Sequence, residues 1–398
     1  MSQKLSLSDL PLKGKKVLMR VDFNVPLNKE GNITDDTRIQ ASLPSIRYVL
    51  DHGGSLILMS HLGRPKEKRV PEMSLKPCAQ RLSELLEKPV ILAPDCIGLE
   101  VEALAKKLQP GQVLLLENLR FHRGEEYPKE DPSFVEALAK LGDLYVNDAF
   151  GTAHRAHAST AAIATYFPGK AAAGFLLTKE IQFLGDALSH PERPFCAVIG
   201  GAKISTKMGV LQALLSKVDV LLIGGAMAYT FFKAQGLNIG ASLHEDDYLE
   251  QARQIVKESQ KSGVRLLLPI DNLIADKIDA KASIKIVDTS QGIPEGWQGV
   301  DIGPKTIHLF IEEAQKSKTI LWNGPLGIFE IRPFANGTKE FAKAMAQIKA
   351  TTIIGGGDSI AAVQAAGVGD KISHLSTGGG ATLEYIEFGT LPGIEALS

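Results

Sequence analysis

The chain has 398 residues, more than one hydrophobic core usually organises, so we expect about two domains. Apolar residues make up 44% and charged residues 22%, a globular balance that excludes an intrinsically disordered chain. Lys and Arg total 44 against 45 for Asp and Glu, so the charge gives no reason to expect a nucleic-acid or membrane partner.

Cysteine usage indicates a reducing compartment, and hydropathy indicates neither a signal peptide nor a membrane span. The three cysteines, Cys78, Cys96 and Cys196, cannot pair completely and show no CxxC or Cys/His ligand spacing, which predicts neither a disulfide framework nor a zinc site. The N-terminal stretch MSQKLSLSDLPLKGKK lacks the apolar core of a signal peptide, and no run approaches the roughly eighteen apolar residues of a spanning helix. We therefore expect a soluble, cytoplasmic protein.

In the first half, short apolar runs alternate with longer segments of helical periodicity. This rhythm is typical of a parallel sheet covered by helices, so the fold class is α/β. The predicted strands of this half are residues 16–21, 55–60, 112–116 and 143–147. Between the last two, Phe134, Leu138 and Leu141 follow Pro132 at helical spacing, which predicts a helix there.

After a candidate connector, the second half shows the same alternation of short apolar runs and longer helical segments. Residues 174–194 predict one amphipathic helix, ended by Pro191 and Pro194. An amphipathic helix is also expected over 246–262, ending at Gly263. The predicted strands of this half are residues 195–199, 218–223, 264–269, 319–322 and 351–354.

Arginine and histidine follow the predicted strands of the first half. Open α/β sheets bind ligands at the carboxyl ends of their strands, and guanidinium groups form planar pairs with carboxylate or phosphate. Any one arginine taken alone is more often a solvated surface residue, but four strand ends repeat the feature. A small, hydroxylated polyanion is therefore the expected ligand, bound by Arg38, His61, Arg64, Arg120 and Arg155, with Asp22 and Asn24 as acceptors for hydroxyls.

Glycine follows the predicted strands of the second half. Such clusters let backbone N–H groups approach phosphates, although a single pair is usually only a turn. Neither a G-x-x-x-x-G-K-[ST] loop nor a G-x-G-x-x-G fingerprint is present, which argues against a P-loop enzyme or an ordinary dinucleotide site. A nucleotide is the expected ligand of these ends, at residues 200–201, 224–225, 323–324, 355–357 and 378–380.

Three charged residues stand beside these glycines. Lys203 and Lys207 are four residues apart, so on a helix they would share a face and could both reach phosphoryl oxygens. Asp358 suits a magnesium ion on nucleotide phosphates, although alone it would be interpreted as a helix N-cap with Ser359. We find no grouped nucleophile and base, so direct transfer between two bound ligands is favoured.

The sequence closely resembles phosphoglycerate kinases over essentially its whole length. The resemblance rests on RVDFNVP, SHLGRP, LENLRFH, VNDAFGTAHRAH, GGAKISTK, WNGPLGIFE, GGGDS and STGGGATLE, in the family's order. It implies two doubly wound, Rossmann-like parallel-sheet domains joined by a helical hinge. The implied boundaries are residues 1–173 for the 3-phosphoglycerate domain, with 383–398 packing back on it, 174–194 for the hinge and 195–382 for the nucleotide domain.

The resemblance also implies roles for individual residues. It implies reversible transfer between 1,3-bisphosphoglycerate and ADP after domain closure, with Mg²⁺ as the cofactor and a monomeric protein. Implied to bind the triose are Asp22, Asn24, Arg38, His61, Leu62, Gly63, Arg64, Arg120 and Arg155. Implied to hold the nucleotide are Lys207, Gly225, Gly299, Glu330, Gly356, Gly357, Asp358 and Ser359, with Asp358 on the metal. Implied to be catalytic are Arg38, Lys203, Gly357 and Gly379.

Small departures from the family pattern and two alternatives remain. The chain has Thr206 where the family often has Asp, Glu67 where it often has Gly, and Arg123-Gly124 after LENLRFH. The alternatives are a non-catalytic nucleotide-binding scaffold and a kinase for another acyl phosphate. The presence of Lys203, Arg38 and Asp358 speaks against the first, and the complete triose set speaks against the second.

Overall fold

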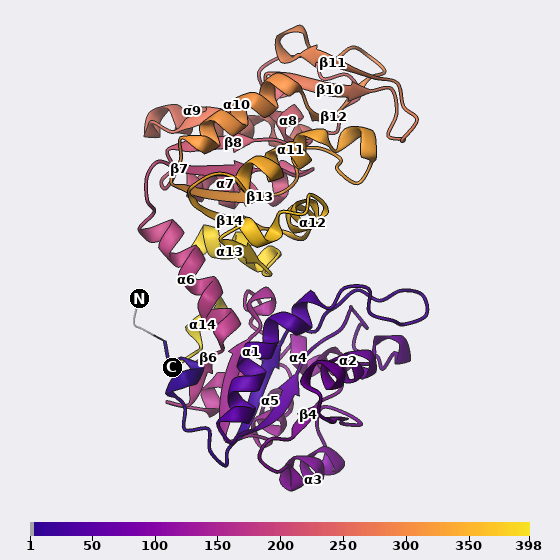
Figure 1. The fold of residues 1–398 in the computed structure, drawn as a ribbon, viewed down its shortest axis with the longest axis vertical. Coiled ribbons are helices and arrows are strands. Elements are labelled where there is room, and N and C mark those ends of the chain that lie inside the picture. The colour runs from indigo at the N-terminus through magenta and orange to yellow at the C-terminus, as the bar shows by residue number, and fades with distance from the viewer. Residues whose placement is uncertain (1–3) are drawn as a thin grey trace. The chain divides into compact units, whose positions relative to one another are not determined.

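The computed structural model describes residues 4–398, which form two compact units (Figure 1). The N-terminal unit comprises the described residues up to Gln182 together with Thr390–Ser398, and the C-terminal unit is Phe183–Gly389. Each contains a six-stranded parallel sheet, which confirms the predicted α/β class and the two doubly wound domains. Within the described residues, no helix is both long and apolar enough to cross a membrane.

The sheet of the N-terminal unit has the order β3-β4-β2-β1-β5-β6. Its strands are β1 (Lys16–Val21), β2 (Ser55–Met59), β3 (Val90–Leu92), β4 (Val113–Leu115), β5 (Leu144–Asp148) and β6 (Ala171–Ala173). The accompanying helices are α1 (Thr37–Asp51), α2 (Lys76–Leu86), α3 (Leu99–Lys107), α4 (Arg123–Glu126), α5 (Pro132–Ala139) and the short α14 (Pro392–Glu395).

Both faces of this sheet are covered, as a buried parallel sheet requires. On one face, Val17 and Met19 of β1 join Ile46 of α1 and Leu82 of α2 in a single buried cluster. Leu18, which points to the opposite face, is also fully buried. The continuous apolar runs seen in the sequence therefore reflect strands with no solvent face.

The sheet of the C-terminal unit has the order β15-β14-β13-β7-β8-β9. Its strands are β7 (Phe195–Ile199), β8 (Val220–Ile223), β9 (Arg265–Leu267), β13 (Thr319–Asn323), β14 (Thr351–Gly355) and β15 (His374–Ser376). Its helices are α7 (Met208–Leu214), α8 (Met227–Ala234), α9 (Leu249–Ser262), α10 (Pro304–Gln315), α11 (Asn336–Met345), α12 (Gly357–Ala365) and α13 (Gly380–Phe388).

The C-terminal unit also carries a small antiparallel sheet that the sequence analysis does not anticipate. It consists of β10 (Asp271–Ala275), β11 (Ile284–Asp288) and β12 (Gln298–Ile302), in the order β11-β10-β12 (Figure 1). Its β12 strand contributes Gly299 to the candidate site described below.

In each parallel sheet, the strands that follow the first strand are added on one side of it, and the strands that come later in the chain are added on its other side. In the C-terminal unit, β7 leads to β8 and β9 on one side and, later in the chain, β13 to β15 follow on the other. The carboxyl ends of β7 and β13 are thus neighbours, and Gly200 N donates to Asn323 O at 2.9 Å. Such switch points are where open α/β sheets bind ligands.

The division between the units falls inside α6 (Phe175–Ser189), between Gln182 and Phe183. This point lies within residues 174–194, the predicted connector. The chain returns to the N-terminal unit at Thr390 instead of at 383. The reason is local: α13 continues to Phe388, and Gly389 ends it in the left-handed region with φ of 75°.

Candidate functional site

The Arg- and His-rich strand ends of the N-terminal unit lie together. Arg38 Nη1 lies 3.2 Å from Asp22 Oδ2 and donates to Asn24 O at 3.0 Å. Asn24 Oδ1 accepts from Gly63 N at 2.8 Å, and Arg120 Nη1 donates to Gly63 O at 3.0 Å. These contacts tie the loops after β1, β2 and β4 to the start of α1.

His61 is held as a neutral donor within this cluster. Its Nδ1 lies 3.1 Å from Nη2 of Arg20, and because a guanidinium can only donate, Nδ1 accepts and the proton sits on Nε2. Burial, followed by the charges of Arg20 and Arg120, holds the pKa of His61 well below its usual value. The ring can therefore offer an N–H to an anion without carrying a charge of its own.

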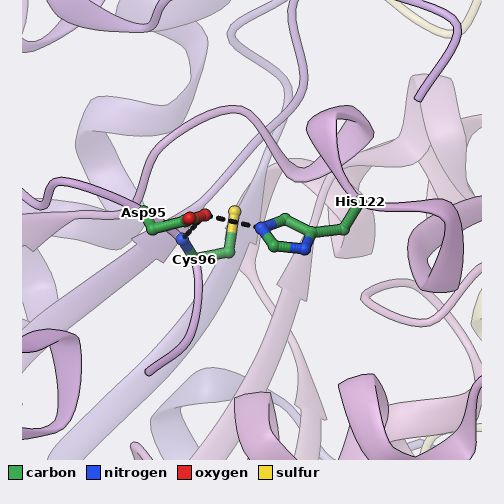
Figure 2. A group of neighbouring side chains, drawn as sticks. All are labelled: Asp95, Cys96 and His122. Carbon is green, nitrogen blue, oxygen red and sulfur yellow. Dashed lines mark hydrogen bonds and ion pairs between the residues drawn. The ribbon is translucent and has the colours of Figure 1, made fainter. Parts of the chain in front are cut away.

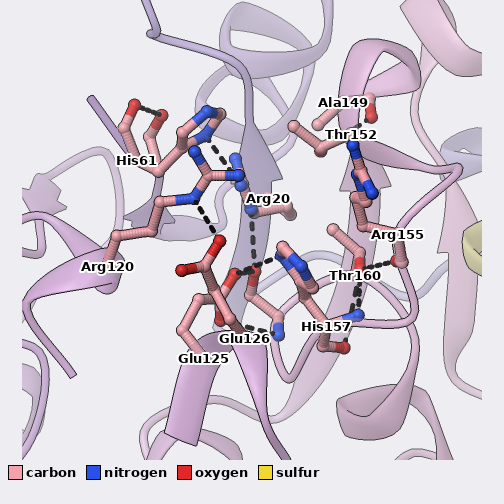
Figure 3. A network of polar contacts seen from close by, with 12 residues as sticks. Arg20, His61, Arg120, Glu125, Glu126, Ala149, Thr152, Arg155, His157 and Thr160 are labelled. Carbon is pink, nitrogen blue, oxygen red and sulfur yellow. Dashed lines mark hydrogen bonds and ion pairs between the residues drawn. The ribbon is translucent and has the colours of Figure 1, made fainter. Parts of the chain in front are cut away.

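A buried hydrogen-bond network of Arg20, Ser159 and Glu125 lies next to the cluster. Figure 3 shows His61, Arg120, Arg155 and His157 around Arg20. Arg20 Nε donates to Ser159 Oγ at 2.8 Å, and Ser159 Oγ donates to Glu125 Oε1 at 2.6 Å. Arg20 and Glu125 are both buried, so the hydroxyl relays contact between two buried opposite charges.

Three members of this cluster have no role predicted from the sequence: Arg20, His154 and His157. Burial and neighbouring arginines lower the pKa of His154 to about 4 and that of His157 to about 3. All three stand inside the motifs RVDFNVP and VNDAFGTAHRAH, so the repetition of Arg and His at strand ends was a signal that could have included them.

The remaining predicted triose residues differ in what they offer a ligand. Arg64 and Arg155 are exposed. Leu62 is buried, and its carbonyl accepts from Asn118 Nδ2 at 2.7 Å, so this residue shapes the loop instead of presenting a side chain.

Two departures from the family pattern contact each other beside the cluster. Arg123 Nη1 lies 3.0 Å from Glu67 Oε1. Glu67 has φ of 60°, in the left-handed region that favours glycine, the residue the family often has at this position.

In the C-terminal unit, the glycine-rich strand ends line a cavity that contains charged side chains. Two lysines line this cavity, together with the glycines at the starts of α12 and α13. Its lining is Gly201, Ala202, Lys203, Thr206, Lys207, Asn323, Gly324, Pro325, Gly356, Gly357, Asp358, Ser359, Gly379, Gly380 and Leu383. Seven of the site residues predicted in this half therefore line one cavity: Lys203, Lys207, Gly356, Gly357, Asp358, Ser359 and Gly379.

A second, more apolar cavity adjoins the first and shares Gly201, Ala202, Pro325 and Asp358 with it. The predicted residues Gly225, Gly299 and Glu330 line it. Sequence reasoning missed its apolar members, among them Tyr229, Leu243, Leu326 and Ile328, because they come from separate elements and share no local pattern.

The prediction that Lys203 and Lys207 share a helical face is wrong. Lys203 is extended, Ile204–Thr206 is a single 3₁₀ turn, and α7 begins only at Met208. The two ammonium groups nonetheless line the same cavity. Burial lowers the pKa of Lys207 to about 8 despite the attraction of Asp358, and its Nζ donates to Asn323 Oδ1 at 2.6 Å. Asn323 Nδ2 is buried without a hydrogen-bond partner, a donor suited to a phosphate oxygen.

Two positions need particular residues because of their contacts with neighbouring loops, Gly225 through backbone crowding and Ser359 through a hydrogen bond. Gly225 has φ of +70°, and a Cβ there would lie 2.5 Å from the N and O atoms of Gly201. Any side chain would therefore separate two of the glycine-rich ends. Ser359 Oγ accepts from Gly324 N at 2.7 Å, so its side chain holds the neighbouring loop in place.

Asp358 fits a magnesium ion carried by nucleotide phosphates. Its carboxylate is exposed in the first turn of α12 and lines both cavities. Mg²⁺ usually keeps several waters and takes one or two carboxylates together with phosphate oxygens, so a single accessible carboxylate beside two lysines and several glycines is a suitable donor set.

Comparisons with known proteins agree with this geometry. The family model described as phosphoglycerate kinase matches residues 7–388. A phosphoglycerate kinase of Chlorobium luteolum is 58% identical over 399 residues, covering 100% of both chains. A cytosolic phosphoglycerate kinase of Triticum aestivum is 54% identical over 395 residues, covering 98% of this chain and 97% of that one.

A solved structure extends the likeness to the fold. The structure of phosphoglycerate kinase from Coxiella burnetii superposes with a TM-score of 0.88 at 40% identity, covering 99% of this chain and 98% of that one. With family motifs along the whole length, both strand-end clusters in place and relatives of this identity, the chain belongs to the phosphoglycerate kinase family.

Proposed function

We propose that the two clusters divide the reaction of this phosphotransferase between them. The N-terminal unit would bind 3-phosphoglycerate or 1,3-bisphosphoglycerate, and the C-terminal unit would bind ADP or ATP. The observation that carries the assignment is the contrast in the groups presented. Guanidinium and imidazole side chains gather on one sheet, while glycine N–H groups, two lysines and one carboxylate gather on the other.

In the ATP-forming direction, a β-phosphate oxygen of ADP attacks the acyl phosphate of 1,3-bisphosphoglycerate in line, and the carboxylate of 3-phosphoglycerate leaves. No proton has to be abstracted from the attacking oxygen, so the protein needs to position the groups and neutralise charge. Arg38 and Lys203 would face the transferring group, and N–H groups of Gly357 and Gly379 would stabilise its oxygens. Bound Mg²⁺ would supply further charge neutralisation on the nucleotide, held by Asp358.

Because the clusters belong to different units, the two ligands must be brought together before transfer. Residues 174–194 are the proposed hinge, and closure would exclude water that could otherwise hydrolyse the acyl phosphate. We further propose that the protein works in the cytoplasm as a monomer. The absence of a spanning helix among the described residues is compatible with this location, as is the cytosolic wheat relative.

A coupled assay tests the activity by following ATP formed from ADP and 1,3-bisphosphoglycerate in the presence of Mg²⁺. The folded protein should form ATP at a rate typical of kinases, about 1 per second or faster. Folded protein that forms none would contradict the proposal.

Calorimetric titration of each ligand tests the division of roles. Asp358→Asn should weaken Mg-nucleotide binding and leave 3-phosphoglycerate binding unchanged, because the lost charge lies in the C-terminal unit. Asp370→Asn, at an exposed carboxylate of the same unit, is the matched control and should change neither affinity. Equal loss of both affinities in Asp358→Asn would remove the support for the metal assignment.

A further inference from the structure

A group of metal-ligating side chains lies outside the contacts described for the triose cluster. Asp95, Cys96 and His122 each offer one ligand atom, and these three atoms all lie within 4.8 Å of one another (Figure 2). From these positions we propose a binding site for one thiophilic divalent cation of the Zn²⁺ class.

Strand pairing brings the three residues together. β3 and β4 are parallel neighbours, so the loops at their carboxyl ends begin at the same edge of the sheet. Asp95 and Cys96 follow β3, and His122 lies in the turn that follows β4. Ala93 N donates to Leu115 O at 2.8 Å, which extends the pairing to the start of the site. Because the ligands lie on loops far apart in sequence, their spacing gives no motif.

Each ligand is already oriented. The His122 ring stacks on Phe134 at a centroid distance of 5.0 Å, and its Nε2 lies 2.5 Å from Asp95 Oδ1. Asp95 Oδ1 also accepts from Cys96 N at 2.7 Å. The Cys96 thiol is buried and donates to Glu117 O at 2.9 Å. Such preorientation lowers the conformational cost of gathering the ligands around an ion.

The local charge favours a cation. The Asp95 carboxylate is itself one of the three ligands, and the Cys96 thiol donates to the backbone carbonyl of Glu117, whose own carboxylate is buried. Carboxylates attract a dication, and a metal ion stabilises a thiolate directly. Arg69, 3.5 Å from Asp95, is an opposing charge whose exposed guanidinium also donates to Pro94 O, and solvent screens an exposed charge.

The ligand set selects the kind of metal. Thiolate and imidazole favour zinc-like ions over Mg²⁺ or Ca²⁺, and three protein ligands leave one tetrahedral position for water. Asp95 and His122 have side chains that are 34% and 27% exposed, so an ion can enter from solvent while Cys96 remains behind them. On binding, the thiol proton passes to solvent, and a neutral His122 moves its proton from Nε2 to Nδ1 to free the ligating lone pair.

Cobalt(II) titration of the full-length protein tests the site, because a thiolate ligand gives a charge-transfer absorption that oxygen donors such as Asp358 cannot give. We expect one Co²⁺ bound per chain with this band, and displacement by Zn²⁺. Cys96→Ser should abolish the band, and His122→Gln should weaken Co²⁺ binding by at least about tenfold. Cys78→Ser, at another buried thiol of the same unit, is the matched control and should keep both band and affinity.

Circular dichroism and melting curves accompany each titration, so that loss of fold is separated from loss of a ligand. If Cys96→Ser does not fold, the His122→Gln variant still tests the site, because it keeps the thiol and removes only a partly exposed imidazole. The proposal is overturned if the wild-type protein shows no thiolate band, if the band survives Cys96→Ser, or if His122→Gln binds Co²⁺ as tightly as wild type.

Discussion

Arg38 stands at a helix start, yet its guanidinium is held in place by neighbouring groups. It lies in the first turn of α1, where the helix dipole disfavours a cation, and its side chain is 37% exposed while contacting Asp22 and Asn24. An anion bound at this place would gain a planar guanidinium that the fold has already positioned.

Arg38→Lys should therefore lower kcat by about 10²-fold, because an ammonium cannot reproduce the fork at a developing charge. Steady-state kinetics with a parallel melting curve checks this, and the melting temperature should hardly change. Arg47→Lys is the control, since Arg47 is an exposed arginine of the same helix that donates to Leu85 O. Near-wild-type turnover in Arg38→Lys would remove Arg38 from the transfer step.

Lys207 predicts a pH dependence of nucleotide binding. With a pKa of about 8, its ammonium is charged below pH 8 and loses its proton as the pH rises above it. Phosphate attracts only the charged form, so nucleotide affinity should fall between pH 7 and pH 9 and binding should take up protons. Calorimetry across this range measures both effects. Lys207→Arg stays charged and should flatten the profile, whereas an equal slope in both proteins would assign the titration to another group.

At the scale of single residues, the sequence predicts the chemical types of the site better than their contacts. Lys203 and Lys207 line the same cavity, but the helical face predicted for them does not exist. The buried Arg20 was not assigned, because only the fold places His61 against its guanidinium.

At the scale of elements, long apolar runs were predictable, whereas the edge strands β3, β6 and β15 were not, and β9 alone among the edge strands of the two parallel sheets was predicted. Residues 16–21 and 195–199 coincide with β1 and β7, since central parallel strands are apolar throughout. The edge strand β6 is Ala171–Ala173, and alanine has little β-propensity. β10 begins with Asp271 and Asn272, residues depleted in strands, and Asp271 is stabilised by accepting from Thr306 N across the fold. A short stretch of sequence cannot predict that contact, because its two residues are 35 positions apart.

The start of α6 depends on one buried carboxylate. Asp148 Oδ1 accepts from Leu176 N at 2.9 Å and from Leu177 N at 3.3 Å, while Oδ2 is buried without a partner. Burial raises the pKa of Asp148 to about 6. The element that leads out of the N-terminal unit is thus capped by a group that is easier to bury protonated than ionised.

Asp148→Asn should keep the capping oxygen and remove the titration. The folded-state pKa of about 6 exceeds the unfolded value, so stability from this group is present below about pH 4 and is lost as the pH rises to about 6. Urea unfolding should then show a free-energy gain of Asn over Asp that grows by about 2 kcal/mol from pH 4 to pH 7. Asp148→Ala, which lacks the cap, should cost about 1 kcal/mol relative to Asn. A gain independent of pH would contradict the assignment.

At the scale of the whole molecule, the proposed assignment of the two ligands to separate units predicts a movement that both ligands favour together. Small-angle scattering should give its smallest radius of gyration for the protein bound to both 3-phosphoglycerate and nucleotide, with smaller changes for either ligand alone. An unchanged radius in the free, singly bound and doubly bound samples would contradict the proposed hinge. Asp358→Asn provides the control, because weakened nucleotide binding should reduce the compaction at fixed ligand concentration.

The return of Thr390–Ser398 to the N-terminal unit has a consequence for biosynthesis. Leu5 N donates to Ser398 O at 2.8 Å, Ser398 N donates to Ala171 O at 3.0 Å, and Leu391, Ile394 and Leu397 are buried. On the ribosome, these partners emerge only after all of Phe183–Gly389 has been translated. The unit made first is therefore completed last, and until then it exposes the apolar surface that the returning segment covers.

A truncated variant that ends at Gly389 reproduces the chain before the returning segment has been translated. It should unfold at lower urea concentration than full-length protein and be cleaved faster by protease within the N-terminal unit, because burying each of the three apolar side chains contributes about 1.5–3 kcal/mol. Adding the missing segment as a separate peptide should restore part of the resistance. If the shortened chain matched the full-length protein in both measurements, the first unit could be finished during translation without waiting for the second.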